Sequence, residues 1–208
     1  MQTFPSDVAF TPAVKAIQEQ KGSRRSYARM EHGEGWQTTV TPELAEFLES
    51  LDMFYLGSAS ASGQPYIQYR GGPPGFLKVL DEHTLGFADF GGNRQYVTVG
   101  NLSENPRAFL FLMDYANSRR VKVWGTARVI EGDAALEAKL RDPAYPGTME
   151  RVILFTVEAW DVNCQQHIHL RFSQRQIAPV IEQLQDQIAE LKAEVERLGS
   201  NLSSDNAK

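Results

Sequence analysis

The spacing of apolar residues divides the chain into three regions. In the first, up to about residue 50, Leu44, Phe47, Leu48 and Leu51 recur at steps of three and four, the period of a helix with one apolar face. Segments 11–22 and 41–51 both begin with Thr-Pro, a hydroxyl N-cap before a proline at the first helical position, so we predict helices there. The segment between them, 22–36, is glycine-rich and basic, and we expect a wrapping arm without regular structure.

The second region, from Met53 onward, has the period and composition of strands. Short segments rich in β-branched and aromatic residues follow one another between polar turns. They are FYLGSAS, YIQYR, FLKVL, TLGFADF, AFLFLM, RVKVWGTARVI and VILFTVEAW. Two helical segments interrupt them, at about 94–104 and at 133–141, and each ends before an Asn-Pro or Asp-Pro pair. The pattern predicts a mainly β, α+β domain with seven strands in a barrel or a sandwich.

The third region, after Ser173, has the heptad pattern of a coiled-coil helix. Alternating steps of four and three separate the apolar residues Ile177, Ile181, Leu184, Ile188, Leu191, Val195 and Leu198. A lone helix with so narrow an apolar stripe is marginal in water, so we expect it either to pair with another copy or to dock on its own barrel. We expect residues 201–208 to form a flexible tail.

Composition and charge narrow the class of protein. Hydrophobic residues make up 42% of the chain and charged residues 23%, which is typical of a globular protein. No apolar run approaches the roughly 20 residues that cross a bilayer, so we expect no membrane segment. The net charge of −5 argues against nucleic-acid binding, which depends on neutralising phosphates. The N-terminus lacks a secretory pattern and the single cysteine, Cys164, excludes an internal disulfide framework, so we expect a cytoplasmic protein.

Two basic segments carry candidate chemistry. In RGGPPGFLKVLD, residues 70–81, glycines allow close approach to a ligand and prolines stiffen the loop, so Arg70 and Lys78 can converge on one phosphate. An ordinary strand break with solvated cations is the alternative. Asn93, Arg94 and Gln95 precede a predicted helix, where free amides and an arginine fork suit a phosphate dianion. A surface arginine on a capped helix fits the same pattern.

Other catalytic patterns are weak. Cys164, His167 and His169 lie close together, but no second cluster of metal ligands accompanies them, so we expect no metal site. Nothing in the sequence places a third group to orient a Cys-His nucleophile pair. The chain contains no Gly-x-Gly-x-x-Gly, phosphate-loop or Gly-x-Ser-x-Gly pattern. The sequence therefore names no catalytic residue.

The order of these features resembles the pyridoxamine 5′-phosphate oxidase-like superfamily of FMN-binding split barrels. Arg-Gly-Gly-Pro-Pro-Gly-Phe is similar to an uncharacterised flavin-nucleotide-binding branch of it, and the likeness runs from about Leu51 to Arg171. The resemblance implies a split β-barrel and a homodimer with FMN in the groove between two barrels. We therefore divide the chain into an N-terminal helical arm at 1–50, a barrel at 51–172, a coiled-coil-like helix at 173–200 and a tail at 201–208.

The resemblance also implies a set of cofactor-binding residues: Arg70, Phe76, Lys78, Ala88, Asp89, Asn93, Arg94, Gln95, Arg120, Trp160 and Arg171. The oxidases separate the arginine and the lysine by five residues, whereas eight separate Arg70 from Lys78. An aromatic-Thr pair of the family is replaced by Ala88-Asp89, and a lysine by Gln95. In the place of a glutamine that faces the flavin, Arg120 can favour the reduced ring or simply face water. Trp160 and Arg171 are spaced like residues that close over FMN from the partner subunit.

These expectations define the function only broadly. We expect an FMN-dependent oxidoreductase in which the flavin performs the electron chemistry and the protein orients it. A non-catalytic protein that binds or stores a flavin, a deazaflavin or haem is the alternative, and an interaction module with an empty pocket is a third. Residues 161–170 do not resemble the oxidases' substrate-phosphate motif, so the substrate and the electron donor stay open.

Overall fold

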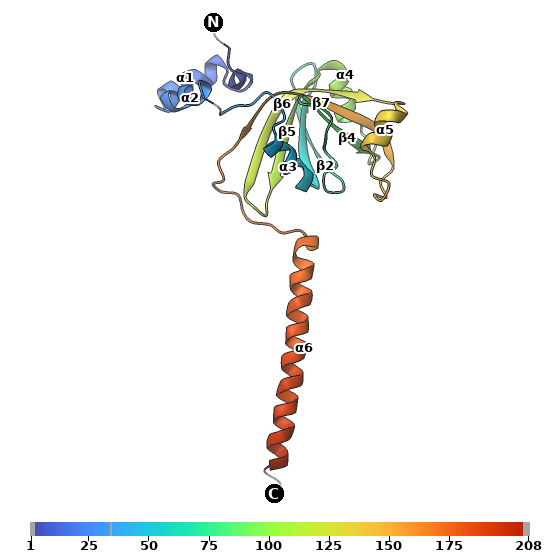
Figure 1. The fold of residues 1–208 in the computed structure, drawn as a ribbon. Coiled ribbons are helices and arrows are strands. Elements are labelled where there is room, and N and C mark those ends of the chain that lie inside the picture. The colour runs from blue at the N-terminus through green and yellow to red at the C-terminus, as the bar shows by residue number, and fades with distance from the viewer. Residues whose placement is uncertain (1–2, 34, 206–208) are drawn as a thin grey trace. The chain divides into compact units, whose positions relative to one another are not determined.

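The computed structural model describes residues 3–33 and 35–205, and these fall into two compact units (Figure 1). The first unit contains the described residues up to Asp114 together with Ser118–Ile168. The second contains Tyr115–Asn117 and the described residues from His169 onward. The predicted division into an arm, a barrel, a helix and a tail stays a prediction.

The strands form one antiparallel sheet in the order β2-β1-β5-β6-β7-β4-β3. Their bounds are β1 Met53–Ala59, β2 Pro65–Gly71, β3 Lys78–Val79, β4 Thr84–Phe90, β5 Arg107–Asp114, β6 Arg119–Ile130 and β7 Met149–Val162. The seven strands and the α+β class predicted from the sequence are confirmed. The FLKVL segment contributes only the two residues of β3 because Phe76 and Leu77, just before it, are buried in the core instead.

The core lies on one face of this curved sheet. Phe54 and Leu56 of β1 are fully buried, and α3 (Pro42–Ser50) adds Leu44, Phe47 and Leu48 to the same cluster. The hydroxyl of Thr41 accepts a hydrogen bond from the amide of Leu44, which is the predicted N-cap. The helix predicted over 41–51 therefore covers the barrel core.

The sheet closes into a split barrel through side chains. β3 pairs only with Leu85 and Gly86 of β4, so within the described residues the second half of β4 has no backbone partner on that side. β2, the opposite edge of the sheet, approaches this free half of β4, and Arg70 of β2 forms an ion pair with Asp89 of β4. We refer to this gap between β2 and β4 as the seam.

The N-terminal region contains η1 (Pro5–Val8), α1 (Pro12–Gln20) and α2 (Arg24–Glu31). The expectation of an irregular arm over 22–36 was wrong, because α2 occupies half of it. The carboxylate of Glu31, with a side chain only 1% exposed, accepts hydrogen bonds from Arg24 and from the Ser6 hydroxyl. These contacts hold α2 against η1, and Arg24 is the basic residue of segment 22–36 that takes part in them.

Three further helices complete the chain: α4 (Val97–Glu104), α5 (Ala134–Leu140) and α6 (Gln174–Asp205). α4 begins three residues later than predicted because Arg94 and Tyr96 adopt left-handed backbone, with φ of 60° and 55°. Of the predicted tail, 201–205 lies within α6 and 206–208 lies outside the described residues. None of the helices in the described part of the chain has the length and apolarity that a membrane crossing requires.

Candidate functional site

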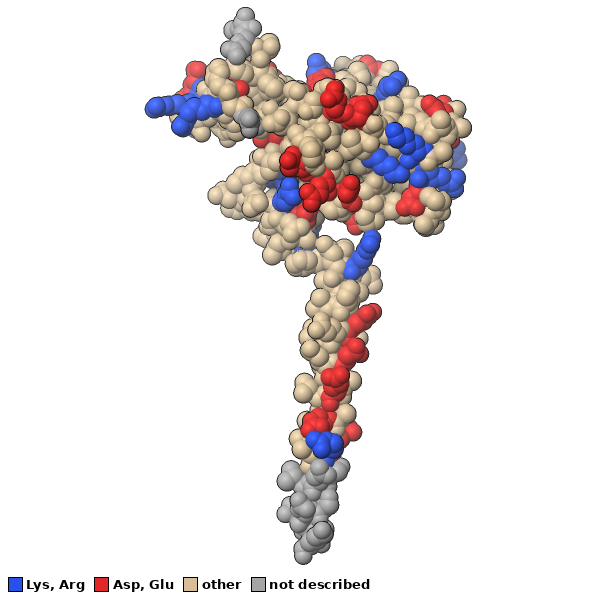
Figure 2. All heavy atoms as spheres, viewed as in Figure 1, with Lys and Arg blue, Asp and Glu red and all other residues tan. Residues whose placement is uncertain are grey.

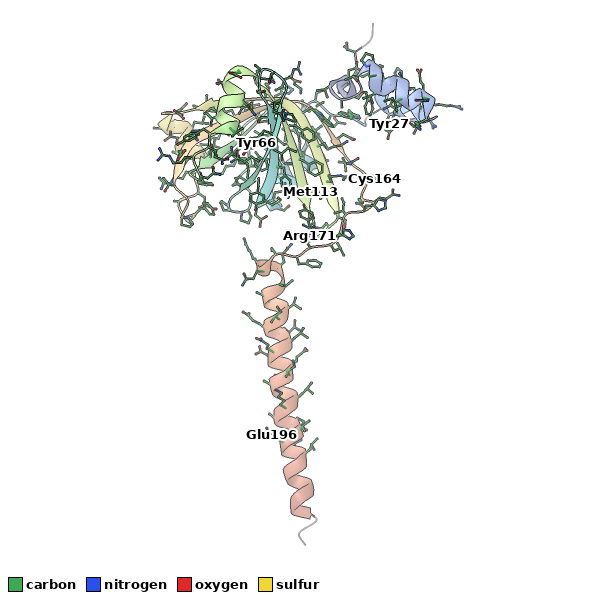
Figure 3. All side chains as sticks on the ribbon, turned by 180° about the vertical axis from the view of Figure 1, so that it is seen from behind. Tyr27, Tyr66, Met113, Cys164, Arg171 and Glu196 are labelled. Atoms are coloured by element: carbon green, nitrogen blue, oxygen red, sulfur yellow. The ribbon has the colours of Figure 1, made fainter. Side chains whose placement is uncertain are left out.

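A pocket of about 240 Å³ opens at the seam. Its wall includes Arg70 of β2, Asp89 of β4, Arg94 and Tyr96 before α4, and Arg151 of β7. Tyr66 of β2, labelled in Figure 3, also lines it. The pocket therefore lies where the sheet closes by side chains, and we refer to it as the seam pocket.

Asp89 joins two arginines in this pocket. Its side chain is 4% exposed, and its two oxygens accept hydrogen bonds from Arg70 Nη1 and from Arg151 Nη1, the latter at 3.3 Å. Arg151 also contacts Glu131 at 3.0 Å and Glu150 at 2.7 Å. Burial lowers the pKa of Arg70, and the negative charge of Asp89 offsets only part of this effect. A guanidinium still keeps its proton at any physiological pH, so the group is a fixed cation.

The pocket retains unused hydrogen-bond donors. Arg70 Nε is buried and has no partner among the described residues. Within the described residues, the Arg94 guanidinium makes one hydrogen bond, from Nε to the Tyr96 hydroxyl at 3.1 Å. No described side chain caps the N-terminus of α4, where the first amides of a helix lack intrahelical partners. The site therefore offers donors that an anion can satisfy.

Backbone conformation and charge support the same conclusion. Left-handed backbone at non-glycine residues such as Arg94 and Tyr96 is uncommon and is concentrated at functional sites. The pocket contains three arginines, Arg70, Arg94 and Arg151, and two carboxylates, Asp89 and Glu150. Glu131, outside the pocket wall, also contacts Arg151, so the charges balance and the attraction for an anion comes from the unused donors and the partial positive charge of the helix end.

Arg70 and Lys78 do not line a common pocket in the described residues. Lys78 and Phe76 line a neighbouring pocket of about 190 Å³, and Lys78 Nζ donates to the carbonyl of Lys139 at 2.9 Å. The glycines of the RGGPPGF loop serve the chain itself. A Cβ on Gly72 would lie 2.5 Å from the Phe76 ring, and Gly75 has a φ of +73°. The loop thus folds onto Phe76, and Arg70 and Lys78 on its two sides line different pockets.

The remaining predicted residues lie elsewhere. Ala88 is buried within β4, and Trp160 belongs to the core, where its indole N–H donates to the carbonyl of Thr39 at 2.7 Å. Arg120 donates to the carbonyl of Cys164 at 3.0 Å. Arg171, labelled in Figure 3, belongs to the second unit. The structure therefore gathers Arg70, Asp89, Asn93, Arg94 and Gln95 of the predicted set in one pocket.

Sequence reasoning missed Arg151. It stands directly opposite Asp89 in the pairing of β4 with β7, so its place in the pocket depends on the register of two distant strands. No local motif could have identified it.

Within the described residues, no three His, Cys, Asp or Glu side chains are grouped to hold a metal ion, and Cys164, His167 and His169 form no such group.

Comparisons with known proteins place this arrangement in a class. The family model described as pyridoxamine 5′-phosphate oxidase matches residues 40–164, which include the whole sheet and the seam pocket. The chain belongs to this family, as its sequence resemblance implies. No curated protein matches it.

Solved structures with a similar fold share little sequence with this chain. An FMN-binding protein from Syntrophomonas wolfei is 15% identical, with a TM-score of 0.44, and the match covers 70% of this chain and 97% of that one. HupZ from Group A Streptococcus is 19% identical, with a TM-score of 0.44, over 56% and 88% of the two chains. HutZ, a haem storage protein from Vibrio cholerae, is 14% identical, with a TM-score of 0.41, over 59% and 94%. At such TM-scores these likenesses carry no argument about function.

Proposed function

We propose that this protein is an FMN-binding flavoprotein of the oxidoreductase type and that the seam pocket holds the FMN phosphate. The observation that supports this most directly is the set of unused donors: Arg70 Nε, the Arg94 guanidinium and the uncapped amides of α4. A phosphate dianion accepts several charge-assisted hydrogen bonds at once, and helix N-termini bind such groups. The donor set therefore fits the phosphate of FMN.

The chain's own residues have distinct roles in this proposal. Arg94 and the α4 amides bind the phosphate, while Asp89 holds Arg70 and Arg151 in fixed orientations. Asn93 Oδ1 accepts a hydrogen bond from the Gln95 amide at 3.2 Å and so shapes the loop that carries Arg94. Bound FMN would supply hydride and electron transfer. The sequence calls for no side-chain base, and both oxygens of Asp89 are already engaged by arginines.

We further propose a homodimer that completes the site. The seam pocket of about 240 Å³ is smaller than the roughly 300–1,000 Å³ of ordinary ligand sites, so one chain offers part of a site. The outer face of β2 carries two exposed apolar side chains two residues apart: Ile67 is 70% exposed and Tyr69 59% exposed. Exposed apolar patches of this kind are typical of protein interfaces. Phe76, Lys78, Ala88, Arg120, Trp160 and Arg171 stay predicted cofactor contacts, based on the resemblance alone.

Haem is a weaker fit for this pocket. Among the described residues that line it there is no histidine, cysteine or methionine, and the axial ligands of haem iron that it offers are the tyrosines Tyr66 and Tyr96. The single cysteine, Cys164, is consistent with the cytoplasmic location that we propose.

Substitution of Arg94 tests the phosphate site. Arg94→Ala should weaken FMN binding by roughly 1.5–3 kcal/mol, because it removes a charged hydrogen bond to the phosphate. Titration calorimetry with FMN measures this change. Arg128→Ala, at an exposed arginine of β6, is the matched control and should leave the affinity unchanged. Equal affinity in the two variants would remove Arg94 from the site.

Reduction of the bound flavin tests the catalytic part. Tightly bound FMN that loses its visible absorption on addition of a reduced nicotinamide nucleotide would support an oxidoreductase. Tightly bound FMN that no nicotinamide donor reduces would instead support the non-catalytic binding protein. A protein that purifies with a deazaflavin or with haem, identified by mass spectrometry of the released molecule, would replace the cofactor proposed here.

A further inference from the structure

The long helix α6 carries an apolar stripe with no partner among the described residues, and we refer to it as the α6 stripe. The side chains of the α6 stripe are between 38% and 69% exposed, and they follow one another at heptad spacing. They are Ile177, Ile181, Leu184, Ile188, Leu191, Val195 and Leu198. A lone helix with such a stripe is marginal in water, because helices in proteins depend on packing of their apolar face. We therefore expect a partner to cover the α6 stripe.

The kind of residue at each position of the α6 stripe indicates which partner covers it. In the heptad notation abcdefg, the a positions are Ile181, Ile188 and Val195, all β-branched. The d positions that follow them are Leu184, Leu191 and Leu198. β-Branched residues at a with leucine at d favour two parallel strands over three or four. The pattern thus selects a second copy of the same helix, in register.

The flanking positions are compatible with this pairing. In a parallel dimer, each g residue faces the e residue five positions further along the other helix. Gln187 would face Lys192, and Glu194 would face Gly199, so neither pair brings two like charges together. Like-charge pairs at these positions would have opposed the dimer. Pro179 occupies an f position, on the side of the helix opposite the α6 stripe.

The charge of α6 argues against a lipid surface as the occupant. Between Gln174 and Leu198 there are five acidic and three basic residues. Figure 2 shows acidic side chains following one another along one side of the helix, in keeping with the four-residue spacing of Glu182, Asp186 and Glu190. Helices that lie on membranes are typically rich in Lys and Arg on the polar face. These carboxylates lie at b, f and c, positions that remain in water in a two-stranded coil.

We propose that α6 forms a parallel, two-stranded coiled coil with α6 of a second copy of this chain, with Ile181 to Leu198 as its core. This interface is distinct from the outer face of the sheet and does not depend on flavin binding. It commits the protein to a two-fold symmetric pair whose helices run in the same direction.

Disulfide cross-linking of the full chain tests both the pairing and its direction. In a Cys164→Ser background, Leu184→Cys and Leu198→Cys are made separately, one near each end of the α6 stripe. Parallel, in-register helices bring each position next to its own copy, within reach of a disulfide. Both variants should therefore form covalent dimers on mild oxidation, as measured by non-reducing electrophoresis. In antiparallel helices neither position meets its own copy.

Ala193→Cys in the same background is the matched control, because position 193 is an f position on the same helix. It should cross-link at least roughly tenfold more slowly, since f positions lie on opposite sides of a two-stranded coil. Equal rates at 184, 193 and 198 would mean that the tails collide without pairing, and the proposal would be wrong. Cross-links at neither 184 nor 198 would overturn it as well.

The stoichiometry tests the number of helices in the coil. Sedimentation equilibrium of the unmodified protein should give twice the mass of one chain, which the proposed sheet contact alone would also give, so the cross-links carry the test of the α6 pairing. A trimer or tetramer would contradict the two-stranded coil even if the cross-links form. A monomer with a protected α6 would show that the helix docks on its own barrel. None of these measurements involves FMN, so they separate this inference from the proposed flavin site.

Discussion

Asp89 is the residue on which both the closure of the barrel and the candidate site depend. The family resemblance expects a hydroxyl near this place, and the chain has a carboxylate instead. The structure gives the reason, because Asp89 neutralises Arg70 and Arg151 in a setting where all three side chains are at most 12% exposed. Two buried cations without this carboxylate would repel each other across the seam.

Asp89→Asn should therefore destabilise the fold by about 3 kcal/mol or more, measured by urea denaturation, because it leaves two buried guanidinium groups without their shared counter-charge. Inorganic phosphate should recover more stability in this variant than in the parent protein, since an added anion can take over the role of the carboxylate. Glu131→Gln is the control: Glu131 also contacts Arg151, but it is 64% exposed and should cost less than about 1 kcal/mol. Similar losses in the two variants would contradict this role of Asp89.

At this scale, the sequence reveals the residues whose position is set locally. The place of Arg94 in the pocket wall was predictable because it lies within a few residues of the start of α4. Arg151 was not, because it reaches the pocket only through the pairing of β4 with β7. The convergence of Arg70 and Lys78 on one phosphate stays a prediction, and within the described residues the two side chains line different pockets. Pattern alone could not show that Gly72 and Phe76 pack together and turn the loop.

Among the elements, the N-terminal helices depend on one buried carboxylate. Burial alone would raise the pKa of Glu31, but the hydrogen bond from Arg24 and the charges of Lys15 and Arg24 outweigh it and lower the pKa below its ordinary value of 4.5. The unfolded chain therefore binds more protons than the folded one in acid. The stabilisation is complete above the ordinary pKa and is lost as the pH falls through the lowered value.

Acidification should accordingly open η1, α1 and α2, which amide hydrogen exchange over residues 5–31 would show as faster exchange. Glu31→Gln should cost about 3 kcal/mol at neutral pH, because two partly buried cations lose their partner, and should flatten the pH dependence. Glu19→Gln, at an exposed residue of α1, should behave like the parent protein. A pH dependence that persists in Glu31→Gln would place the responsible group elsewhere.

Elements with a strong period were predictable, and elements held by tertiary contacts were less so. The strands and the α3 helix follow from alternation and from a Thr-Pro start, as the N-cap of Thr41 shows. α2 was missed because its sequence is charged and glycine-flanked, and because its stability comes from Ser6 and Lys15, far away in the chain. β3 was overestimated because burial of Phe76 and Leu77 overrides their strand propensity.

For the whole molecule, two proposed contacts join the same pair of chains, through the sheet and through α6. Linked contacts reinforce each other, because forming one greatly raises the effective concentration for the other. Breaking either contact alone, with Ile67→Glu on the sheet or Leu191→Glu on α6, should leave the dimer intact at micromolar concentration. The two changes together should raise the dissociation constant by roughly 100-fold or more over either single variant.

Sedimentation over a dilution series measures these constants. Val79→Glu, at an exposed apolar residue of β3, is the control for surface charge and should not alter assembly. A combined variant no weaker than Leu191→Glu alone would mean that the sheet contributes nothing to the pair. The heptad pattern located the α6 contact in the sequence, whereas the contact on the sheet became visible only from the exposed fraction of Ile67.

The side-chain closure of the barrel also determines how a phosphate would enter. In a barrel sealed by backbone hydrogen bonds, access to the wall requires that strands separate. Here the contact between Arg70 and Asp89 closes the gap through side chains, so an incoming anion can reach the unused donors of the seam pocket while every ladder bond stays in place. Loading the proposed site then adds an anion to cations that Asp89 already orients, and dissolved salt competes directly for the same cations.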